Sequence, residues 1–296
     1  MPIVVAGEAL VDLVPGGDDR LDAHPGGGPF NTARTLGRLA CPVAFLGRIS
    51  TDRFGARLAG ELAADGVALD ACVRTDDPTT LALVELDARG NAAYRFYTEG
   101  TAAAGLTPVD ALAALPRATT YLHVGTLGLV LEPVADALEA VVRELHGHAL
   151  VMVDPNCRPA ATPDPAAYRE RLGRVLARAD VVKVSEEDLA WLGVPARTLL
   201  DQGPAAVLLT RGGDGAVALT ARGETAIPAP PVEVVDTIGA GDAFSGGWLA
   251  WWSERGLARD ALADPAAVAD ATGFACLVAA RTCERPGASP PRRSEL

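Results

Sequence analysis

Residues 121–154 decide the class of fold, because they hold Tyr121-Leu122-His123-Val124, an amphipathic stretch over Pro133–Leu145, and Leu150-Val151-Met152-Val153-Asp154. The two short runs are almost continuously apolar, which is typical of strands covered on both faces of a parallel sheet. The stretch between them has the length and periodicity of a helix. Together the three segments predict a βαβ unit, in which the helix returns the chain so that the second strand runs parallel to the first.

The same alternation continues on both sides of this unit. Further strands are expected at Ile3–Ala6, Val43–Leu46, Val181–Val184 and Val207–Thr210, and further helices at Phe30–Leu39, Phe54–Ala64, Ala166–Ala179 and Glu186–Leu192. Strands that alternate with helices in this way predict a three-layer, doubly wound α/β fold with a mainly parallel sheet. No proline-rich linker or internal repeat divides the chain, so residues 1–296 are expected to form a single domain.

One region breaks the alternation. Thr80–Asp87 and Ala92–Thr98 have the pattern of two strands, and Ala88-Arg89-Gly90-Asn91 between them is typical of a hairpin turn. A strand over about residues 10–16 is expected beside them. We interpret residues 10–16 and 80–98 as a small β-sheet lid outside the main sheet. An antiparallel edge on the main sheet is the alternative.

Composition and charge exclude several classes of protein. The chain has 26 basic and 38 acidic side chains, a net charge of −12 and a pI near 4.8, and it has no basic run with which to bind nucleic acid. No stretch of about 18 residues is continuously apolar, and the N-terminus lacks the pattern of a signal peptide, so we expect no membrane segment and a cytoplasmic protein. The five cysteines are scattered, which makes zinc or a disulfide framework unlikely.

Lys183 is the only lysine among the 26 basic residues. It stands in Val181-Val182-Lys183-Val184 with no glycine-rich loop before it, so the chain has no P-loop. The His-Arg-Asp and Asp-Phe-Gly motifs of protein kinases do not follow it either. From the local pattern we expect Lys183 to end a strand.

The strongest local signal lies in Val234–Phe244, which contains Ile238-Gly239-Ala240-Gly241-Asp242 directly before a predicted helix from about Asp242 to Glu254. Glycines let backbone N–H groups converge, and the N-terminus of a helix carries a partial positive charge, so the segment can bind an anion. A carboxylate at that place, Asp242, can accept a proton from a hydroxyl that attacks phosphorus. The alternative is that Asp242 only caps the helix.

A second glycine-rich signal is Pro25-Gly26-Gly27-Gly28-Pro29-Phe30-Asn31, which also precedes a helix. The glycines permit a ligand to approach the backbone, and the Asn31 amide offers both donors and acceptors. The segment is not a dinucleotide fingerprint, because the final glycine of that motif would have to stand where Asn31 is.

Taken together, the two signals resemble the two signatures of the ribokinase-like (PfkB) family of carbohydrate kinases. The resemblance covers nearly the whole chain. It includes, in the family's order, Gly7–Asp12, Phe45–Arg48, Asp154–Arg158, Lys183–Asp188, Thr210–Gly215 and Thr282–Ala288, the last of these resembling fructokinases in particular.

The resemblance implies a role for each matching residue. Asp242 would be the catalytic base, Gly239, Ala240 and Gly241 would form the anion hole, and Arg158 would lie near the substrate and the transferred phosphate. The sugar-binding positions would be Asp12, Gly27, Gly28 and Asn31, and the nucleotide-binding positions Thr210, Gly212 and Gly215, with which we place Lys183. Asp236 and Thr237 match positions that bind a monovalent cation, and the hairpin matches a lid that in many relatives also forms a dimer interface.

Two departures from the family pattern concern the metal and the nucleotide. Ser185 and Asp188 replace the asparagine and glutamate of the family's Asn-x-x-Glu motif, so Asp188 would order magnesium through water with a shorter side chain. Cys276 stands where relatives often have asparagine near adenine, and its apolar neighbours also predict a core position.

These features predict a kinase that uses ATP and Mg²⁺ to phosphorylate a primary hydroxyl of a small sugar, and K⁺ is the expected monovalent cation. Fructose giving fructose 6-phosphate is the first expectation, and ribose, 2-keto-3-deoxygluconate and nucleosides are the alternatives within the family. A sugar-binding sensor without turnover and a nicotinamide dehydrogenase are the alternatives of other classes, and the missing fingerprint disfavours the second. The expected partners are the sugar, ATP and a second copy of the chain bound through the lid.

Overall fold

The computed structural model describes residues 2–16, 20–86 and 92–296. The strands are β1 (Ile3–Ala6), β2 (Leu10–Pro15), β3 (Leu21–Gly26), β4 (Val43–Leu46), β5 (Arg48–Ser50), β6 (Val73–Thr75), β7 (Leu81–Leu86), β8 (Ala92–Tyr97), β9 (Tyr121–Gly125), β10 (Leu150–Asp154), β11 (Val181–Ser185), β12 (Ala206–Thr210), β13 (Ala216–Thr220) and β14 (Gly223–Ile227). The α-helices are α1 (Gly28–Arg38), α2 (Arg53–Ala64), α3 (Pro108–Ala114), α4 (Val134–Leu145), α5 (Pro165–Leu176), α6 (Glu186–Leu192), α7 (Ala240–Glu254) and α8 (Pro265–Cys283).

The main sheet has eight strands in the order β14-β13-β12-β11-β10-β9-β1-β4. The six strands from β12 to β4 are parallel, and β13 and β14 join the β12 edge in antiparallel pairs. The βαβ unit formed by β9, α4 and β10 is present, with Leu150 opposite Tyr121 in parallel register. The prediction of a mainly parallel α/β sheet is therefore confirmed.

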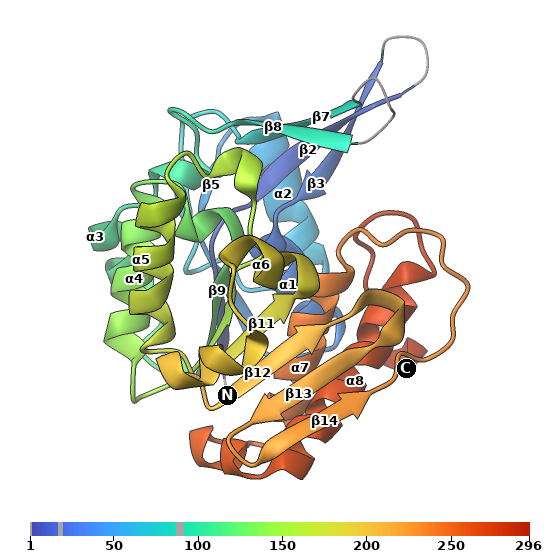
Figure 1. Cartoon of the computed structure of the whole chain (residues 1–296). Helices are drawn as coiled ribbons and strands as arrows, with labels where there is room; N and C mark the ends of the chain where they lie inside the picture. The colour runs from blue at the N-terminus through green and yellow to red at the C-terminus, as the bar shows by residue number, and fades with distance from the viewer. Residues whose placement is uncertain (1, 17–19, 87–91) are drawn as a thin grey trace.

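Helices cover both faces of the main sheet, which gives three layers (Figure 1). Side chains of α1, α2, α7 and α8 form one apolar core with one face, and those of α3, α4 and α5 form a second core with the other face. Because strand side chains alternate between faces, Val182 and Val184 of β11 belong to the second core while Val181 faces the first. Lys183 points to the same side as Val181, toward the N-terminal end of α7.

A separate four-stranded sheet, β3-β2-β7-β8, projects from the main body beyond α2 (Figure 1). The predicted hairpin strands are confirmed as β7 and β8, which pair antiparallel, and the predicted turn lies outside the described residues. The hairpin is not an edge of the main sheet. β3 was not predicted, because its exposed sequence Leu21-Asp22-Ala23-His24-Pro25-Gly26 lacks an apolar alternation, and its pairing with β2 holds it in place.

Three further features of the fold differ from the prediction or were not part of it. Lys183 is the middle residue of β11 rather than its end. β13 and β14 were not predicted, because an alanine-rich strand and an exposed edge strand have weak patterns. α8 has the length and apolar composition of a membrane span, but it packs on β13 and α7 in the first core, which explains its composition by burial inside the fold.

Candidate active site

The candidate site lies at the carboxyl ends of the parallel strands, where α/β sheets bind their ligands. Thr126 follows β9, Asn156 follows β10, and Ser185 ends β11. Thr126 and Asn156 both have positive φ angles, of 54° and 38°. Such backbone strain in non-glycine residues gathers at functional sites, where the surrounding structure holds it. The Asn156 side-chain amide donates to the Thr126 hydroxyl at 3.4 Å, which ties the two strained turns together.

Asp242 lies in the first turn of α7 and is buried, with 8% of its surface exposed. Its Oδ2 accepts a hydrogen bond from the Asn31 side-chain amide at 2.9 Å, and Thr32 Oγ1 donates to its backbone oxygen at 3.3 Å. The N-cap of α7 is Gly239, and no side chain caps this helix end. The Asp242 carboxylate is therefore held by α1 and does not cap its own helix.

The two glycine-rich segments thus meet, although 211 positions separate Asn31 from Asp242. Gly28 lies between them: a Cβ at this position would collide with Thr126 Oγ1 and would lie 3.3 Å from Asp242 Oδ1. Any side chain at position 28 would fill the space directly beside the carboxylate. Glycine therefore leaves this space free of a side chain.

The environment of Asp242 sets its proton affinity. Burial raises the pKa of Asp242 to about 6, and Asn31 lowers it by donating to the charged form. The negative charge of Asp154 raises this pKa, and the positive charges of Lys183 and Arg158 lower it. A base must be deprotonated at the working pH and still hold a proton well enough to remove it from a hydroxyl. A carboxylate with a pKa near 6 meets both conditions at neutral pH.

The predicted anion hole is the turn that leads into α7. Gly239 has φ +77°, in the left-handed region that glycine adopts without strain. The Ala240 N–H donates to the Thr237 carbonyl at 3.2 Å, so this predicted donor is engaged within the turn. The first-turn N–H groups of Gly241 and Asp242 have no intrahelical acceptor by geometry, and they lie at the positive end of the helix dipole. The turn can therefore bind a phosphoryl group, and the Gly241 N–H is more available as a donor than the Ala240 N–H.

Of the predicted sugar-binding residues, Asp12 lies in the lid, and Gly27, Gly28 and Asn31 lie at the start of α1. Arg158, which was predicted to lie near the substrate and the transferred phosphate, follows β10. Asp12 lies on β2 with its carboxylate against Gly26, and burial raises its pKa to about 6 while His24 and Arg158 lower it. Arg158 donates through Nη1 to the Asn156 and Cys157 carbonyls, which fixes the guanidinium beside the strained turn. Asp12 and Arg158 thus lie close enough for the Arg158 charge to lower the pKa of Asp12.

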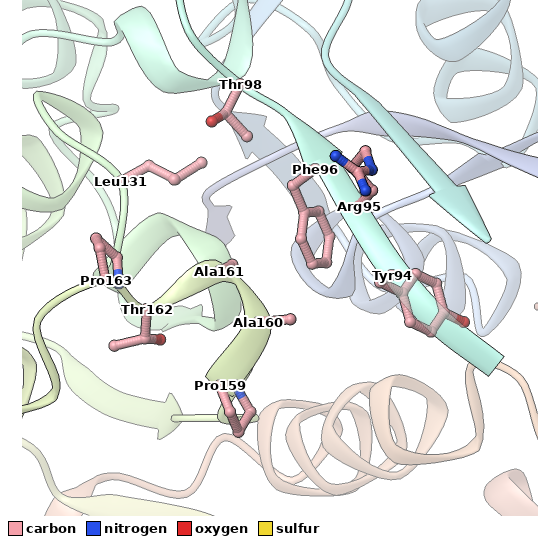
Figure 2. A pocket seen from close by; sticks show the side chains of 10 residues that line it. All are labelled: Tyr94, Arg95, Phe96, Thr98, Leu131, Pro159, Ala160, Ala161, Thr162 and Pro163. Atoms are coloured by element: carbon pink, nitrogen blue, oxygen red, sulfur yellow. The ribbon is translucent and has the colours of Figure 1, made fainter. Parts of the chain in front are cut away.

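A cavity of about 590 Å³ lies between lid strand β8 and the loop after Arg158. Tyr94, Phe96 and Thr98 of the lid face Pro159 and the residues that follow it (Figure 2). Burial raises the pKa of the Tyr94 phenol, and the nearby Asp12 charge raises it further. The lid therefore brings aromatic side chains to the edge of the region that holds Asp12 and Arg158.

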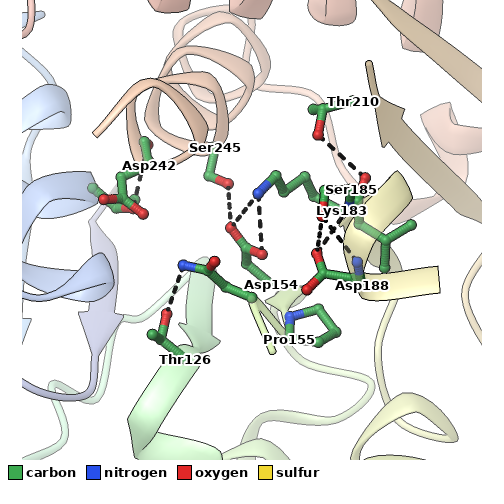
Figure 3. Close-up of polar contacts among 12 residues, drawn as sticks. Thr126, Asp154, Pro155, Lys183, Ser185, Asp188, Thr210, Asp242 and Ser245 are labelled. Atoms are coloured by element: carbon green, nitrogen blue, oxygen red, sulfur yellow. Dashed lines mark hydrogen bonds and ion pairs between the residues drawn. The ribbon is translucent and has the colours of Figure 1, made fainter. Parts of the chain in front are cut away.

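A buried polar cluster lies where α7 meets strands β10 and β11 (Figure 3). Lys183 Nζ donates to Asp154 Oδ2 at 3.0 Å and to Oδ1 at 3.3 Å, and Ser245 Oγ of α7 donates to the same carboxylate at 3.3 Å. A Cβ built on Gly241 would lie 3.0 Å from Lys183 Nζ, so the ammonium group touches the anion-binding turn. The cluster joins β10, β11 and α7 and places a cation under the turn.

A second cavity, of about 850 Å³, extends from this turn along α8. The predicted nucleotide-binding residues Thr210, Gly212, Gly215 and Lys183 all line it, together with Arg158 and Gly241. Its volume is within the range of roughly 300–1,000 Å³ that is usual for small-molecule sites. The structure thus collects these predicted residues around one space that ends at the anion-binding turn.

The predicted metal ligands are already engaged. Asp188 accepts hydrogen bonds from the Ser185 N–H, the Ser185 hydroxyl and the Cys157 N–H, and with Ser185 it forms the capping box of α6. Asp236 accepts from the Ile238 and Gly287 N–H groups. Within the described ranges no group of three or more His, Cys, Asp or Glu side chains could hold a metal ion. The carboxylate of Asp188 thus accepts three hydrogen bonds and that of Asp236 two, so neighbouring groups hold both side chains in place.

Glu8 was missed as a site residue, although it follows β1 at the same edge of the sheet. Its Oε2 accepts from the Gly128 N–H at 3.0 Å, and its Oε1 has no hydrogen-bond partner among the described residues. Burial raises the pKa of Glu8 to about 8, to which the Asp242 charge adds. Asp154 and Ser245 were missed as well; a carboxylate that ends an apolar strand is the sequence signal that points to Asp154.

Glu8 should make stability depend on pH. Its pKa in the folded protein, about 8, lies above the usual 4.5, so the native state binds a proton that the unfolded chain has lost within this window. Native stability from this group is full below pH 4.5 and falls as the pH rises to about 8. Glu8→Gln removes this titration. The free energy of unfolding of the variant, measured with urea, should therefore rise relative to that of the wild type between pH 5 and 8, by up to about 1.4 kcal/mol per pH unit. A constant difference between the two proteins over this range would contradict the assignment.

The site as a whole has the parts of a phosphotransferase: a buried base, an anion-binding helix N-terminus and a cavity for a phosphate donor. The model of the pfkB family carbohydrate kinases matches residues 3–295. The chain is 38% identical over 293 residues to a fructokinase of Klebsiella pneumoniae, covering 92% of this chain and 91% of that one.

Solved structures agree with this family relationship. The fructokinase of Xylella fastidiosa with bound ATP superposes with a TM-score of 0.90 at 29% identity, covering 99% of this chain and 96% of that one. The fructokinase of Vibrio cholerae O395 with fructose, ADP and a calcium ion has a TM-score of 0.85 at 29% identity, covering 97% and 94%. The chain therefore belongs to the pfkB family of carbohydrate kinases, and it is a sugar kinase with the ribokinase-like fold.

Proposed function

We propose that this kinase transfers the γ-phosphoryl group of ATP to the primary 6-hydroxyl of fructose, giving fructose 6-phosphate. The observation that carries the proposal is the meeting of Asn31 and Asp242 beside Gly28, next to the turn that leads into α7. It supports Asp242 as a base of suitable proton affinity close to the anion-binding end of α7. The fructokinase relatives support fructose over ribose, 2-keto-3-deoxygluconate or a nucleoside.

In the proposed reaction the Asp242 carboxylate accepts the proton of the hydroxyl as its oxygen attacks the γ-phosphorus. The N–H groups of Gly241 and Asp242 and the charges of Lys183 and Arg158 stabilise the negative charge on the transferred group. Asp12 and Asn31 hydrogen-bond sugar hydroxyls and set the orientation of the acceptor. The lid, through Tyr94 and Phe96, excludes water that would otherwise compete with the sugar.

We propose that magnesium arrives with the nucleotide as MgATP, since the carboxylate of Asp188 is already engaged by Ser185 and Cys157. The ion would supply charge neutralisation between the phosphates. Potassium binding at Asp236 and Thr237 stays a prediction that no observed contact supports. We also retain as proposals a single domain over residues 1–296, a cytoplasmic location and a homodimer through the lid, whose Leu21 and Tyr97 are exposed.

The test is a coupled assay of ADP release with MgATP and a panel of fructose, ribose, 2-keto-3-deoxygluconate and a nucleoside, with the product identified by its phosphate position. Fructose should give the highest kcat/KM, with phosphate at position 6. A higher kcat/KM for another acceptor would show that fructose is not the preferred substrate, while the protein would still be a sugar kinase. Sugar-dependent thermal stabilisation without ADP release from any acceptor would favour the non-catalytic sensor.

The pH dependence of turnover should report Asp242. Its pKa of about 6 means that the base is protonated, and inactive, below this value. We expect kcat/KM for the sugar to rise tenfold per unit up to about pH 6 and then level off. Asn31→Ala removes a donor that favours the charged form, so it should move the acid limb to higher pH. An acid limb at the same pH in both proteins would show that another group titrates.

A further inference from the structure

The 850 Å³ cavity has two chemically different ends. The end at the anion-binding turn is lined by Arg158, Lys183 and Gly241, which provide charge and backbone donors for phosphates. If the protein is the kinase proposed above, a nucleoside triphosphate must place its phosphates at this end. Its base then lies at the other end, between the loop that follows β14 and helix α8.

The far end is lined mainly by side chains without nitrogen or oxygen. They come from the loop after β14 and from one face of α8: Pro230, Pro231, Val232, Val234, Cys276, Ala279, Ala280 and Cys283. Thr237 of the same loop adds one hydroxyl, and the two thiols are weak donors and acceptors. Burial raises the pKa of the Cys276 thiol to about 11, so it is neutral at physiological pH.

The backbone that follows β14 adds few hydrogen-bond donors. Pro228, Pro230 and Pro231 have no N–H, and they occupy three of the four positions that follow β14. The Cys283 carbonyl already accepts from the Val235 and Asp236 N–H groups. Val234, at the rim of this end, is 60% exposed, so the polar edge of a bound base can stay in contact with water.

We propose that this end of the cavity binds a purine base by shape and apolar contact, and that GTP and ITP serve as phosphoryl donors about as well as ATP. Adenine, guanine and hypoxanthine share their ring faces and differ in the polar groups at their edges. An apolar pocket distinguishes such ligands by only about 10–200-fold, whereas a site with hydrogen-bonding groups reaches about 10⁴–10⁵-fold. Cys276 is the position at which a polar side chain would create that discrimination.

The experiment compares kcat/KM for ATP, GTP and ITP at saturating acceptor sugar in the wild type, Cys276→Asn and Cys72→Asn. In the wild type we expect the three values to lie within about tenfold of one another. Cys276→Asn introduces an amide donor and acceptor beside the base, so the ratio of ATP to GTP should change at least about tenfold. Cys72 lies just before β6 and outside the cavity, so the same replacement there should leave the ratio unchanged.

Rejection of GTP and ITP by more than about tenfold in the wild type would overturn the proposal. So would a folded Cys276→Asn variant with an unchanged ratio, because position 276 would then not face the base. Thermal stabilisation by ADP, GDP and IDP gives an independent measure, and equal shifts are expected. If no acceptor is phosphorylated but the three diphosphates stabilise equally, the proposed function fails while the inference about the base stands.

Discussion

Asp242→Asn is expected to lower kcat by about 10²–10⁴-fold, the range that a general base contributes, with little change in KM for the sugar. Asparagine has nearly the shape of aspartate, and its side-chain oxygen can still accept the hydrogen bond from Asn31. The architecture is thereby kept, while the group that takes the proton is lost. Steady-state kinetics with both substrates varied, together with a melting curve, would measure the effect.

Asp180→Asn is the matched control for this variant. Asp180 is also a buried aspartate, 4% exposed, but it precedes β11 at the amino end of the sheet, where it accepts from the Val151 N–H and pairs with Arg259. Its replacement should lower stability and leave kcat near the wild-type value. A loss of kcat in Asp180→Asn as large as in Asp242→Asn would show that removal of any buried carboxylate disables the enzyme, and Asp242 would lose its special role.

The main sheet could be predicted because its strands are short, apolar and covered on both faces. Val43–Leu46 and Leu150–Asp154 were placed with both ends correct, since each run is bounded by residues that do not continue it. β3 and β14 depend instead on pairing with a distant or neighbouring strand, and their own sequences are largely exposed. Such edge strands carry little pattern of their own, so sequence alone does not reveal them.

The site was predictable where the sequence carries unusual glycines and not where it carries ordinary residues. Asp242 and Asn31 follow glycine-rich turns and were identified, but their contact at 2.9 Å arises only from the packing of α1 on α7. Ser245 has no local signal, because it is an ordinary helical serine, and the only signal for Glu8 is its place just after an apolar strand. Asp188 was predicted to order magnesium through water, whereas its part in the capping box of α6 and its three hydrogen bonds became visible only with the turn after β10 in place.

Lys183→Met is the second change with a large expected effect. The variant removes the cation that lies under Gly241 and leaves Asp154 buried without its charged partner. We expect kcat/KM for ATP to fall by about 10²-fold, the lower bound for losing one preorganised group that stabilises charge in a transition state, with KM for the sugar nearly unchanged. Stability should fall as well, by about 3–5 kcal/mol, because breaking a buried ion pair strands a charge.

Two further variants separate the electrostatic role of Lys183 from its structural one. In Lys183→Met/Asp154→Asn neither charge remains, so most of the lost stability should return, while kcat/KM for ATP should stay low because the turn still lacks its cation. Arg259→Met breaks the half-exposed pair with Asp180 at the opposite end of the sheet, and it should cost some stability without changing the use of ATP. If the double variant recovered activity together with stability, Lys183 would serve only to hold β10, β11 and α7 together.

The chain uses arginine at its 25 other basic positions. Since a Cβ at Gly241 would already lie 3.0 Å from Nζ, the longer, planar guanidinium of arginine has no room there, and Lys183→Arg should restore the charge without restoring full activity.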